Sequence, residues 1–275
     1  MRFLITGANR GIGRAVAEQL LSEGAEVVAA VRQPADMPEV LASNPALVAV
    51  PLDLTDRRSP ATAVQAALAT GSLDGIVCNA GVSTLAAVED QIDGDFERVM
   101  ATNFDGHRLL LRAALPHLRK RRAGRIVFVS SLSGLFGLPG EAAYCASKFA
   151  TEALAQCLRF EVERLGIHVS VVSPGYTHTE LAGNSDLDLS TEANSPYRAL
   201  MEYLLTAQKQ GEQEGDAAEI VAASIVHALM AETPKARYLP GSAEALAEIW
   251  RESSEADFFD VIRHTLDLES APLPQ

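Results

Sequence analysis

Two kinds of segment alternate along this chain, and their alternation limits the folds that it can adopt. Short apolar runs rich in β-branched residues occur at 2–6, 26–31, 47–50, 73–78, 125–130 and 167–173. Segments with helical spacing of apolar residues lie between them, at 12–21, 61–68, 96–118 and 142–165. Apolar runs of this length are typical of buried strands. The pattern predicts βαβ units with right-handed crossovers, and hence a parallel sheet with helices on both faces.

The later part of the chain departs from this pattern. Residues 176–215 are largely polar, so we expect a lid insertion made of loop and short helices there. Helical spacing returns at 216–230, and a strand candidate follows at 236–239. Residues 241–275 have amphipathic spacing and predict a C-terminal helical extension. The chain has 275 residues, of which 48% are hydrophobic, so it has enough apolar residues for one core. We therefore expect residues 1–275 to form a single domain.

Charge and cysteine content exclude several classes of function. The 23 Lys and Arg residues against 36 Asp and Glu residues give a net charge of −13, which repels nucleic acids and anionic membranes. The three cysteines, Cys78, Cys145 and Cys157, form no Cys-x-x-Cys pair, so neither a disulfide framework nor a metal site is predicted. The sequence shows no signal-peptide core and no apolar run of about 20 residues. We therefore expect a cytoplasmic protein without a membrane span, a metal or a nucleic-acid partner.

A glycine-rich segment, Thr-Gly-Ala-Asn-Arg-Gly-Ile-Gly, follows the first predicted strand at 6–13 and opens the first helix. Gly7 permits a tight turn, Gly11 lets the backbone approach a pyrophosphate, and Gly13 lets helix and strand pack closely. The helix N-terminus then faces the anion. A plain turn is the alternative, but the strand before and the helix after favour dinucleotide binding. Together with the alternation, this segment predicts a Rossmann-type, doubly wound parallel sheet of about seven strands.

Two arginines near the end of the second predicted strand bear on the choice of dinucleotide. An acidic residue about 20 residues past the glycines usually binds a free ribose 2′-hydroxyl. Here the strand ends Ala-Ala-Val-Arg32, and no acid follows until Asp36. Arg32 and Arg10 suit a 2′-phosphate, because a guanidinium can pair with it through two bonds. The sequence favours NADP(H) over NAD(H); the alternative is that both arginines only cap a solvated sheet edge.

A Tyr-x-x-x-Lys pair, Tyr144 and Lys148, lies near the start of a predicted helix, where both side chains share a face. A phenol with a pKa of about 10 is a poor base at neutral pH. The neighbouring ammonium and a positive nicotinamide are expected to lower the pKa of Tyr144. Ser131 ends the preceding strand, at the edge of the sheet where ligands of open α/β folds bind.

These motifs, taken in order, resemble those of the short-chain dehydrogenase/reductase family. The resemblance covers about 2–239 and includes the segment 6–13, Asp53-Leu54, Asn79-Ala80-Gly81, Asn103, Ser131, the Tyr144 and Lys148 pair, and Pro174-Gly175 with Thr179. It implies that Tyr144 is the general acid/base and that Ser131 hydrogen-bonds the substrate oxygen. It also implies that Lys148 binds the nicotinamide ribose and that Asn103 holds a water of a proton relay.

The same resemblance implies a set of cofactor-binding residues. Asp53 and Leu54 would contact adenine, Asn79 to Gly81 would line the cofactor groove, and Thr179 would contact the carboxamide. The full set expected to bind cofactor is Gly7, Asn9, Arg10, Gly11, Ile12, Gly13, Arg32, Asp53, Leu54, Asn79, Ala80, Gly81, Tyr144, Lys148, Pro174, Gly175, Thr177 and Thr179.

Within this family, residues 124–154 are most similar to the estradiol 17β-dehydrogenases and retinol-dehydrogenase-like members. That similarity implies a bulky apolar, steroid-like alcohol or ketone as the substrate and a homo-oligomer, a dimer or a tetramer. Two alternatives stay open, a reductase of acyl-thioester or small ketone substrates and a non-catalytic NAD(P)-binding sensor. The presence of Asn103, Ser131, Tyr144 and Lys148 argues against the sensor.

Overall fold

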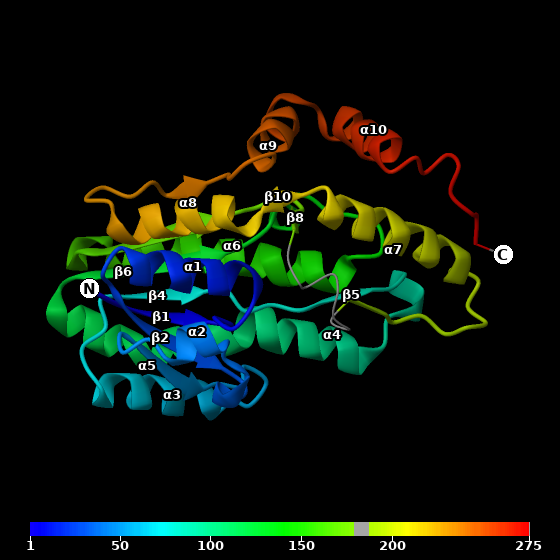
Figure 1. Ribbon diagram of the computed structural model, residues 1–275. Helices are drawn as coiled ribbons and strands as arrows, with labels where there is room; N and C mark the ends of the chain where they lie inside the picture. Colours follow the sequence, from blue (N-terminus) through cyan, green and yellow to red (C-terminus); the bar gives the residue numbers. More distant parts are fainter. Residues whose placement is uncertain (179–186, 275) are drawn as a thin grey trace.

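The computed structural model describes residues 1–178 and 187–274. Its centre is a sheet of seven parallel strands between two layers of helices (Figure 1). The strand order is β11-β7-β6-β4-β1-β2-β3, which confirms the predicted doubly wound sheet of about seven strands. The strands are β1 (Arg2–Thr6), β2 (Glu26–Val31), β3 (Leu47–Pro51), β4 (Gly75–Cys78), β6 (Gly124–Val129), β7 (Ile167–Val172) and β11 (Arg237–Tyr238).

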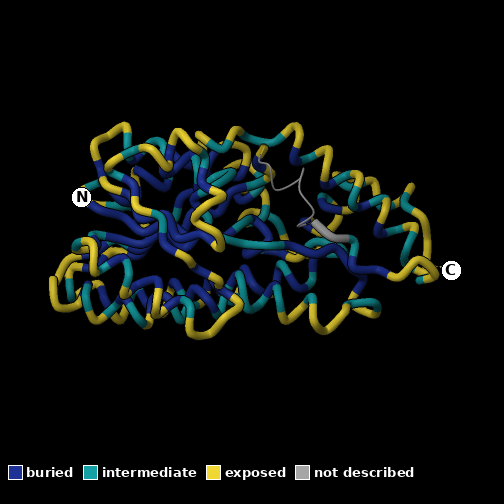
Figure 2. The backbone as a smooth tube through the Cα atoms, turned by 60° about the horizontal axis from the view of Figure 1, so that its bottom comes forward, coloured by how far each residue is buried: buried dark blue, intermediate teal, exposed yellow. Residues whose placement is uncertain are grey.

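The central strands are apolar throughout because both of their faces are covered. Side chains alternate between the faces, so that Phe3 and Ile5 of β1 enter one core cluster while Leu4 enters the other. The first cluster includes residues of α1 (Gly11–Ser22) and α8 (Ala218–Met230). The second includes residues of α3 (Ser59–Ala69), α5 (Gly106–Arg121) and α6 (Ala142–Val162). Figure 2 shows the buried strands running between helices whose outer sides are exposed.

The order of the strands places a crevice at the carboxyl ends of the central strands β1 and β4. From β1 the chain builds outward through β2 and β3, and then returns to pair β4 with the other side of β1. Loops leaving β1 and β4 therefore diverge above the carboxyl ends of these strands. This switch point is where ligands of open α/β sheets bind.

The stretch predicted as one helix at 96–118 is two α-helices with a widened turn between them. Helix α4 (Asp93–Met100) leads into a π-helical segment, Ala101–Asp105, which continues as α5. Such widened turns are rare and often lie at functional sites. Apolar periodicity does not reveal this one, because a single wider turn hardly changes which residues face the core.

The insertion is more regular than the sequence predicts, whereas the extension matches the prediction. The insertion contains β8 (Thr177–His178), β9 (Leu187–Leu189) and α7 (Arg198–Gln213), which at 16 residues is not a short helix. Strand β9 pairs with β5 (Ser83–Leu85), and β8 pairs with β10 (Asp216–Ala217). The extension forms α9 (Ala243–Glu252) and α10 (Glu255–Thr265), as predicted. A further short α-helix in the described residues is α2 (Glu39–Ala42).

An aromatic cluster attaches the C-terminal extension to the rest of the domain. The rings of Phe136 and Phe258 lie 4.7 Å apart, as do those of Trp250 and Phe258. Tilted and edge-on aromatic pairs at this separation add to the stability gained from burial. Of the helices in the described part of the chain, none combines the length and the apolar composition needed to cross a membrane.

Candidate active site

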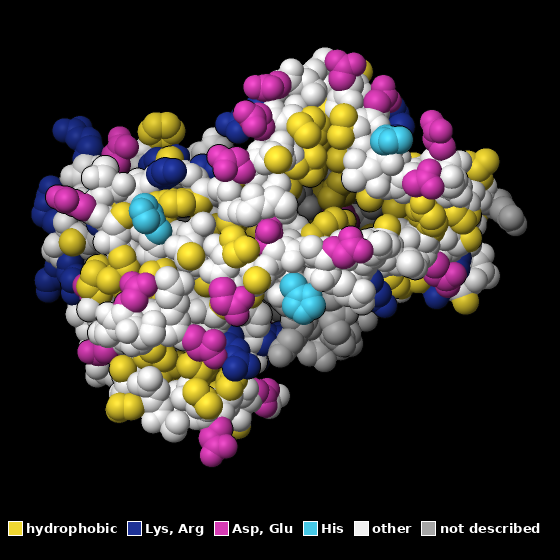
Figure 3. Space-filling view, turned by 45° about the horizontal axis from the view of Figure 1, so that its top comes forward, with side chains coloured by type: hydrophobic (Ala, Val, Ile, Leu, Met, Phe, Trp, Pro, Cys, Tyr) yellow, Lys and Arg dark blue, Asp and Glu magenta, His cyan; other side chains and the backbone are white. Residues whose placement is uncertain are grey.

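A continuous cavity of about 1140 Å³ runs along the carboxyl ends of the strands. It extends from the glycine-rich loop after β1, past the ends of β4, β6 and β7, to α7 and the C-terminal helices. Figure 3 shows the surface hollowed beneath the C-terminal lobe, with hydrophobic side chains in the hollow. All described members of the predicted site except Gly13 and Asn103 line this cavity.

The glycine-rich loop has the conformation that its sequence predicts. Gly7 has φ +70°, in the left-handed region that glycine tolerates. A Cβ on Gly13 would lie 2.3 Å from the Gly7 carbonyl oxygen, so the first turn of α1 rests on the loop. Helix α1 has no side-chain N-cap, and an uncapped N-terminus can bind an anion.

A buried hydrogen-bond chain joins this loop to two neighbouring segments. Thr6 Oγ1 accepts hydrogen bonds from the backbone N–H groups of Asn79 and Ala80, each at 2.9 Å. His107 Nε2 lies 3.0 Å from the same oxygen, and its Nδ1 lies 3.1 Å from the Asn103 carbonyl oxygen. Burial lowers the pKa of His107 to about 4, so the imidazole is neutral. These hydrogen bonds hold the segment 79–81, which follows β4, against the end of β1.

Sequence reasoning missed Thr6 and His107 as parts of the site. Their signals are weak: Thr6 directly precedes Gly7, and His107 lies one helical turn after Asn103. Only the packing of α5 against the sheet brings the two side chains together.

Arg10, Arg32, Asp53 and Leu54 all line the cavity, and Arg32 lies within electrostatic range of Asp53. A hydrogen bond from the Thr55 hydroxyl is the main cause that lowers the pKa of Asp53, and the charge of Arg32 contributes. Asp53 Oδ1 accepts hydrogen bonds from the Thr55 hydroxyl at 2.7 Å and the Thr55 N–H at 2.9 Å. Asp53 is therefore a carboxylate, and a cation lies within its electrostatic range. The preference for NADP(H) stays a prediction.

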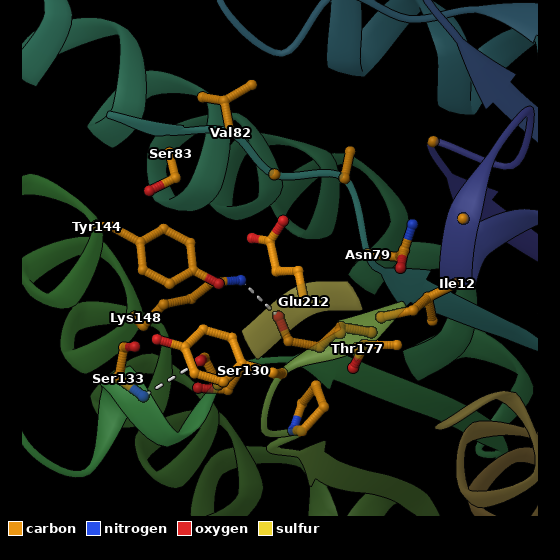
Figure 4. Close-up of a pocket in the computed structure, with 18 of the residues that line it drawn as sticks. Ile12, Asn79, Val82, Ser83, Ser130, Ser133, Tyr144, Lys148, Thr177 and Glu212 are labelled. Carbon is orange, nitrogen blue, oxygen red and sulfur yellow. Dashed lines mark hydrogen bonds between the residues drawn. The ribbon is translucent and has the colours of Figure 1, made fainter. Parts of the chain in front are cut away.

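The Tyr-x-x-x-Lys pair begins α6 and faces the cavity, as Figure 4 shows. Lys148 is 5% exposed, its Nζ donates a hydrogen bond of 2.9 Å to the Val129 carbonyl oxygen, and it lies 5.4 Å from the centre of the Tyr144 ring. Burial lowers the pKa of Lys148 to about 8. Ser131 lies just after β6, where its Oγ accepts a hydrogen bond of 3.1 Å from the Ser133 N–H.

In the protein alone the pKa of Tyr144 is raised, whereas the predicted lowering also counted the positive charge of a bound nicotinamide. Burial of the phenol is the main cause that raises it, and the nearby Glu141 carboxylate raises it further. A hydrogen bond with Ser131 acts in the lowering direction but is the weaker effect. The sequence could not reveal this, because it shows the Lys148 charge at helical spacing but not the burial of the ring. In the protein alone, Tyr144 is a neutral phenol and can donate a proton.

Asn103 lies in the π-helical segment and joins three parts of the site. Its Oδ1 accepts a hydrogen bond from the Val82 N–H at 2.8 Å, and its Nδ2 donates to the Val82 carbonyl and to Ser147 Oγ, each at 2.9 Å. These bonds fix the loop after β4 against α6. The predicted water of a proton relay stays a prediction.

The loop after β7 completes the wall around the catalytic residues. The Pro174 carbonyl oxygen accepts a hydrogen bond from the Leu132 N–H at 3.0 Å, and Thr177 Oγ1 donates to the Gly175 carbonyl oxygen at 3.2 Å. Pro174, Gly175 and Thr177 all line the cavity. The predicted contact of Thr179 lies outside the described residues.

The substrate end of the cavity combines an apolar wall with polar groups that sequence reasoning missed. The apolar side chains come from the loop after β6 and from the C-terminal extension. Glu141, Gln208 and Glu212 face the same space. Burial raises the pKa of Glu141 to about 7 and also raises that of Glu212. Glu141 could have been noticed three residues before Tyr144, whereas nothing in the sequence marks the two residues of α7.

Comparison with known proteins shows what this chain is similar to. The sequence profile of the short chain dehydrogenase family matches residues 2–190. The chain is 39% identical over 193 residues to dehydrogenase/reductase SDR family member 7B of Bos taurus, which covers 66% of this chain and 59% of that protein. It is 32% identical over 252 residues to 17-beta-hydroxysteroid dehydrogenase type 1 of Mus musculus, which covers 86% and 72%. The chain thus spans less than two thirds of the length of the first of these relatives.

A solved structure matches nearly the whole chain. A short-chain dehydrogenase from Streptomyces avermitilis superposes with a TM-score of 0.80 at 30% identity, covering 97% of this chain and 94% of that one. The match includes the C-terminal extension, because so little of the chain is left out. These similarities confirm the resemblance predicted from the order of the motifs.

Proposed function

Because this chain belongs to the short-chain dehydrogenase/reductase family, we propose that it is an oxidoreductase of CH–OH groups, which interconverts a secondary alcohol and a ketone with Tyr144 as the general acid/base. One observation carries the proposal. Ser131, Tyr144 and Lys148 line the same cavity as the glycine-rich loop, so a dinucleotide and a substrate can meet beside the phenol.

The residues present fit a nicotinamide dinucleotide. The uncapped N-terminus of α1 and the close approach of Gly13 to Gly7 leave backbone N–H groups available to a pyrophosphate. The bound cofactor would supply hydride chemistry. Gly7, Asn9, Gly11 and Ile12 would hold its phosphates, and Lys148 would bind its nicotinamide ribose.

The side chains of the site supply a proton and a hydrogen-bond donor. In reduction, the neutral Tyr144 phenol gives its proton to the carbonyl oxygen as the carbonyl carbon gains a hydride. Ser131 Oγ donates a hydrogen bond to that same oxygen while negative charge develops there. In oxidation the alcohol proton passes to a Tyr144 phenolate, which the positive charges of Lys148 and the nicotinamide would stabilise.

NADP(H) is the proposed cofactor. Arg10 and Arg32 both line the cavity, and no acidic residue ends β2. Guanidinium groups bind phosphate through paired, charge-assisted hydrogen bonds. Asp53, whose pKa the charge of Arg32 helps to lower, competes for that cation and reduces the expected preference.

The proposed substrate has a bulky apolar body. The wall near Ser131 is formed by Leu132 and Phe136, and the C-terminal extension adds Leu246, Ile262 and Leu266. Apolar linings of this kind bind ligands mainly through buried area. Similarity to a 17-beta-hydroxysteroid dehydrogenase supports a compound of steroid size.

The outer face of α6 supports a homo-oligomer. Phe149 and Phe160 are exposed on this helix, with 46% and 76% of their surfaces accessible. Exposed aromatic side chains on one helix are typical of protein interfaces. Sedimentation of the purified chain, compared with a Phe160→Ser variant, tests this interface.

Initial rates with estradiol test the oxidoreductase, measured in parallel with NADP⁺ and NAD⁺. We expect reduction of the nicotinamide, faster with NADP⁺ at equal low cofactor concentration. Preference for NAD⁺ would contradict the roles given to Arg10 and Arg32. If estradiol is inert with both cofactors, the steroid-like substrate is wrong, and smaller alcohols and acetoacetyl thioesters are the next substrates to assay.

A further inference from the structure

The substrate end of the cavity contains a buried polar cluster that the proposed chemistry does not use. It consists of Glu141, at the N-terminus of α6, and Gln208 and Glu212, one turn apart on α7. Their exposed fractions are 6%, 8% and 8%. All three line the cavity, and Figure 4 shows the Glu212 side chain projecting into it near Tyr144. We call these residues the acceptor cluster.

Two oxygen atoms of this cluster are left without partners. Glu212 Oε1 accepts a hydrogen bond of 3.4 Å from Gln208 Nε2, but Glu212 Oε2 and Gln208 Oε1 have no hydrogen-bond partner among the residues that the structure describes. Glu141 Oε2 accepts a hydrogen bond of 3.2 Å from Ser133 Oγ. A buried acceptor without a partner costs about 1–3 kcal/mol, and more if it is charged.

The protein supplies little positive charge to balance the two carboxyl groups. Lys209 lowers the pKa of Glu212, but its side chain is exposed and does not line the cavity. Lys148 is committed to the Val129 carbonyl oxygen, and Arg237 pairs with Glu152 rather than with the cluster. Two carboxyl groups that share a space also repel each other when both are ionised. A ligand that brings hydrogen-bond donors and positive charge would therefore stabilise the cluster.

We propose that the acceptor cluster binds a protonated amine carried by the substrate, an inference that rests on the proposed oxidoreductase function. An ammonium group has three hydrogen-bond donors and no acceptor. It matches Glu212 Oε2, Gln208 Oε1 and the Glu141 carboxylate in both donor count and charge. A neutral hydroxyl offers one donor and no charge, so it would leave at least one of these acceptors unpaired.

The position of the acceptor cluster indicates where the amine lies on the substrate. Glu141 is the N-cap residue of α6, three residues before Tyr144, and Figure 4 shows Glu212 near the Tyr144 phenol. The charges of both carboxyl groups raise the pKa of this phenol. The amine is therefore near the reacting carbon. The apolar wall of Phe136, Leu246 and Ile262 accommodates the rest of the molecule. The substrate class is an amino alcohol, or the matching amino ketone, with a large apolar body.

Helix α7 is held where it can present these groups. A Cβ on Gly211 would lie 2.6 Å from the Tyr176 ring, so only glycine lets the helix pack this closely on the loop after β7. Gly211 lies between Gln208 and Glu212 on the same helix. The position of the cluster is thus set by the close packing of α7 on the segment that follows β7.

Three alcohols of the same shape test the proposal. In 1-amino-2-decanol, the carbon next to the alcohol carbon carries an ammonium group. In 1,2-decanediol a hydroxyl replaces this ammonium group, and in 3-undecanol a methyl group replaces it. Binding of each to the enzyme with NADP⁺ is measured by calorimetry, and oxidation is measured by nicotinamide absorbance. We expect the amine to bind at least about tenfold more tightly than 3-undecanol, because a charge-assisted hydrogen bond is involved.

Two variants remove the charge without changing the shape of the site. Glu212→Gln should reduce the preference for the amine over the methyl compound to about threefold or less, and Glu141→Gln should also reduce it. Glu202→Gln is the matched control, because it removes the same charge from an exposed position of α7. It should leave the preference unchanged. Cofactor binding and thermal unfolding show that each variant is folded.

The outcomes separate this inference from the oxidoreductase itself. If all three alcohols are oxidised with equal affinity, or if the diol matches the amine, the amine site is wrong and the enzyme stands. If Glu212→Gln retains the full preference, the acceptor cluster does not bind the amine and the inference fails. If the amine alone binds tightly, depends on Glu212 and is not oxidised, the binding site is supported and the proposed chemistry fails.

Discussion

The two ends of the cavity differ in whether their buried polar groups have hydrogen-bond partners. At the cofactor end, Thr6, His107 and Asn103 bond to one another and to neighbouring backbone groups. At the substrate end, oxygen atoms of Gln208 and Glu212 are buried without described partners. A satisfied network stabilises the fold, whereas unsatisfied acceptors destabilise it until a ligand binds. The first end is therefore built for rigidity, and the second is specialised for a particular substrate.

The strongest test of the region between the two ends is removal of the phenol. Tyr144→Phe should reduce turnover about a thousandfold, because it removes the proton donor and leaves the ring. Dissociation constants for NADP⁺ should change less than about twofold, since Lys148 and the glycine-rich loop are intact. Steady-state rates and fluorescence titration of the cofactor measure the two effects. Turnover that survives this change would contradict the role of Tyr144.

Breaking the satisfied network should destabilise the whole domain. His107→Ala removes the partner of Thr6 Oγ1 and of the Asn103 carbonyl oxygen, and it leaves a cavity. We expect the free energy of unfolding to fall by about 3 kcal/mol, measured by urea denaturation. His168→Ala, at an exposed position of β7, is the control and should change it by less than about 0.5 kcal/mol. Equal losses in the two variants would contradict the comparison.

The acceptor cluster should make the free energy of unfolding depend on pH. Burial raises the pKa of Glu141 from its usual 4.5 to about 7, so between these values the folded protein binds more protons than the unfolded chain. Stability should therefore fall as pH rises through this range, by about 3 kcal/mol in total. Glu141→Gln removes this carboxyl group, so the variant should gain stability relative to wild type at about pH 8 and not at about pH 4. Urea denaturation at both pH values measures this. A constant difference between the two proteins would contradict the pKa shift.

The smallest expected effect concerns the choice of cofactor. Arg32→Ala should weaken NADP⁺ binding by about tenfold and leave NAD⁺ binding nearly unchanged. The ratio of the two dissociation constants, measured by titration, reports this directly. Arg112→Ala, on α5 and outside the cavity lining, is the control. An equal loss for both cofactors would assign Arg32 to general electrostatics and not to the 2′-phosphate.

Local spacing predicted most of the cofactor end. The glycines at 7, 11 and 13 and the pair Tyr144 and Lys148 act through near neighbours in the chain, so their geometry follows from a turn or from one helical turn. The fold followed in the same way from the alternation of strands and helices. The length of α7 and the π-helical segment were missed, because polar composition and a single wider turn leave little periodic signal.

By itself, the sequence determined the sheet, its layers and the identity of the chemical groups after β1, β6 and the start of α6, because short-range periodicity and backbone sterics encode them. Only the tertiary structure decided how those groups behave. It placed His107 on Thr6, brought Glu212 of α7 to the Tyr144 phenol, and shifted the pKa of Tyr144 upward where its lysine neighbour predicted a downward shift. Burial and long-range contacts control these properties, and both arise when segments distant in the chain pack together.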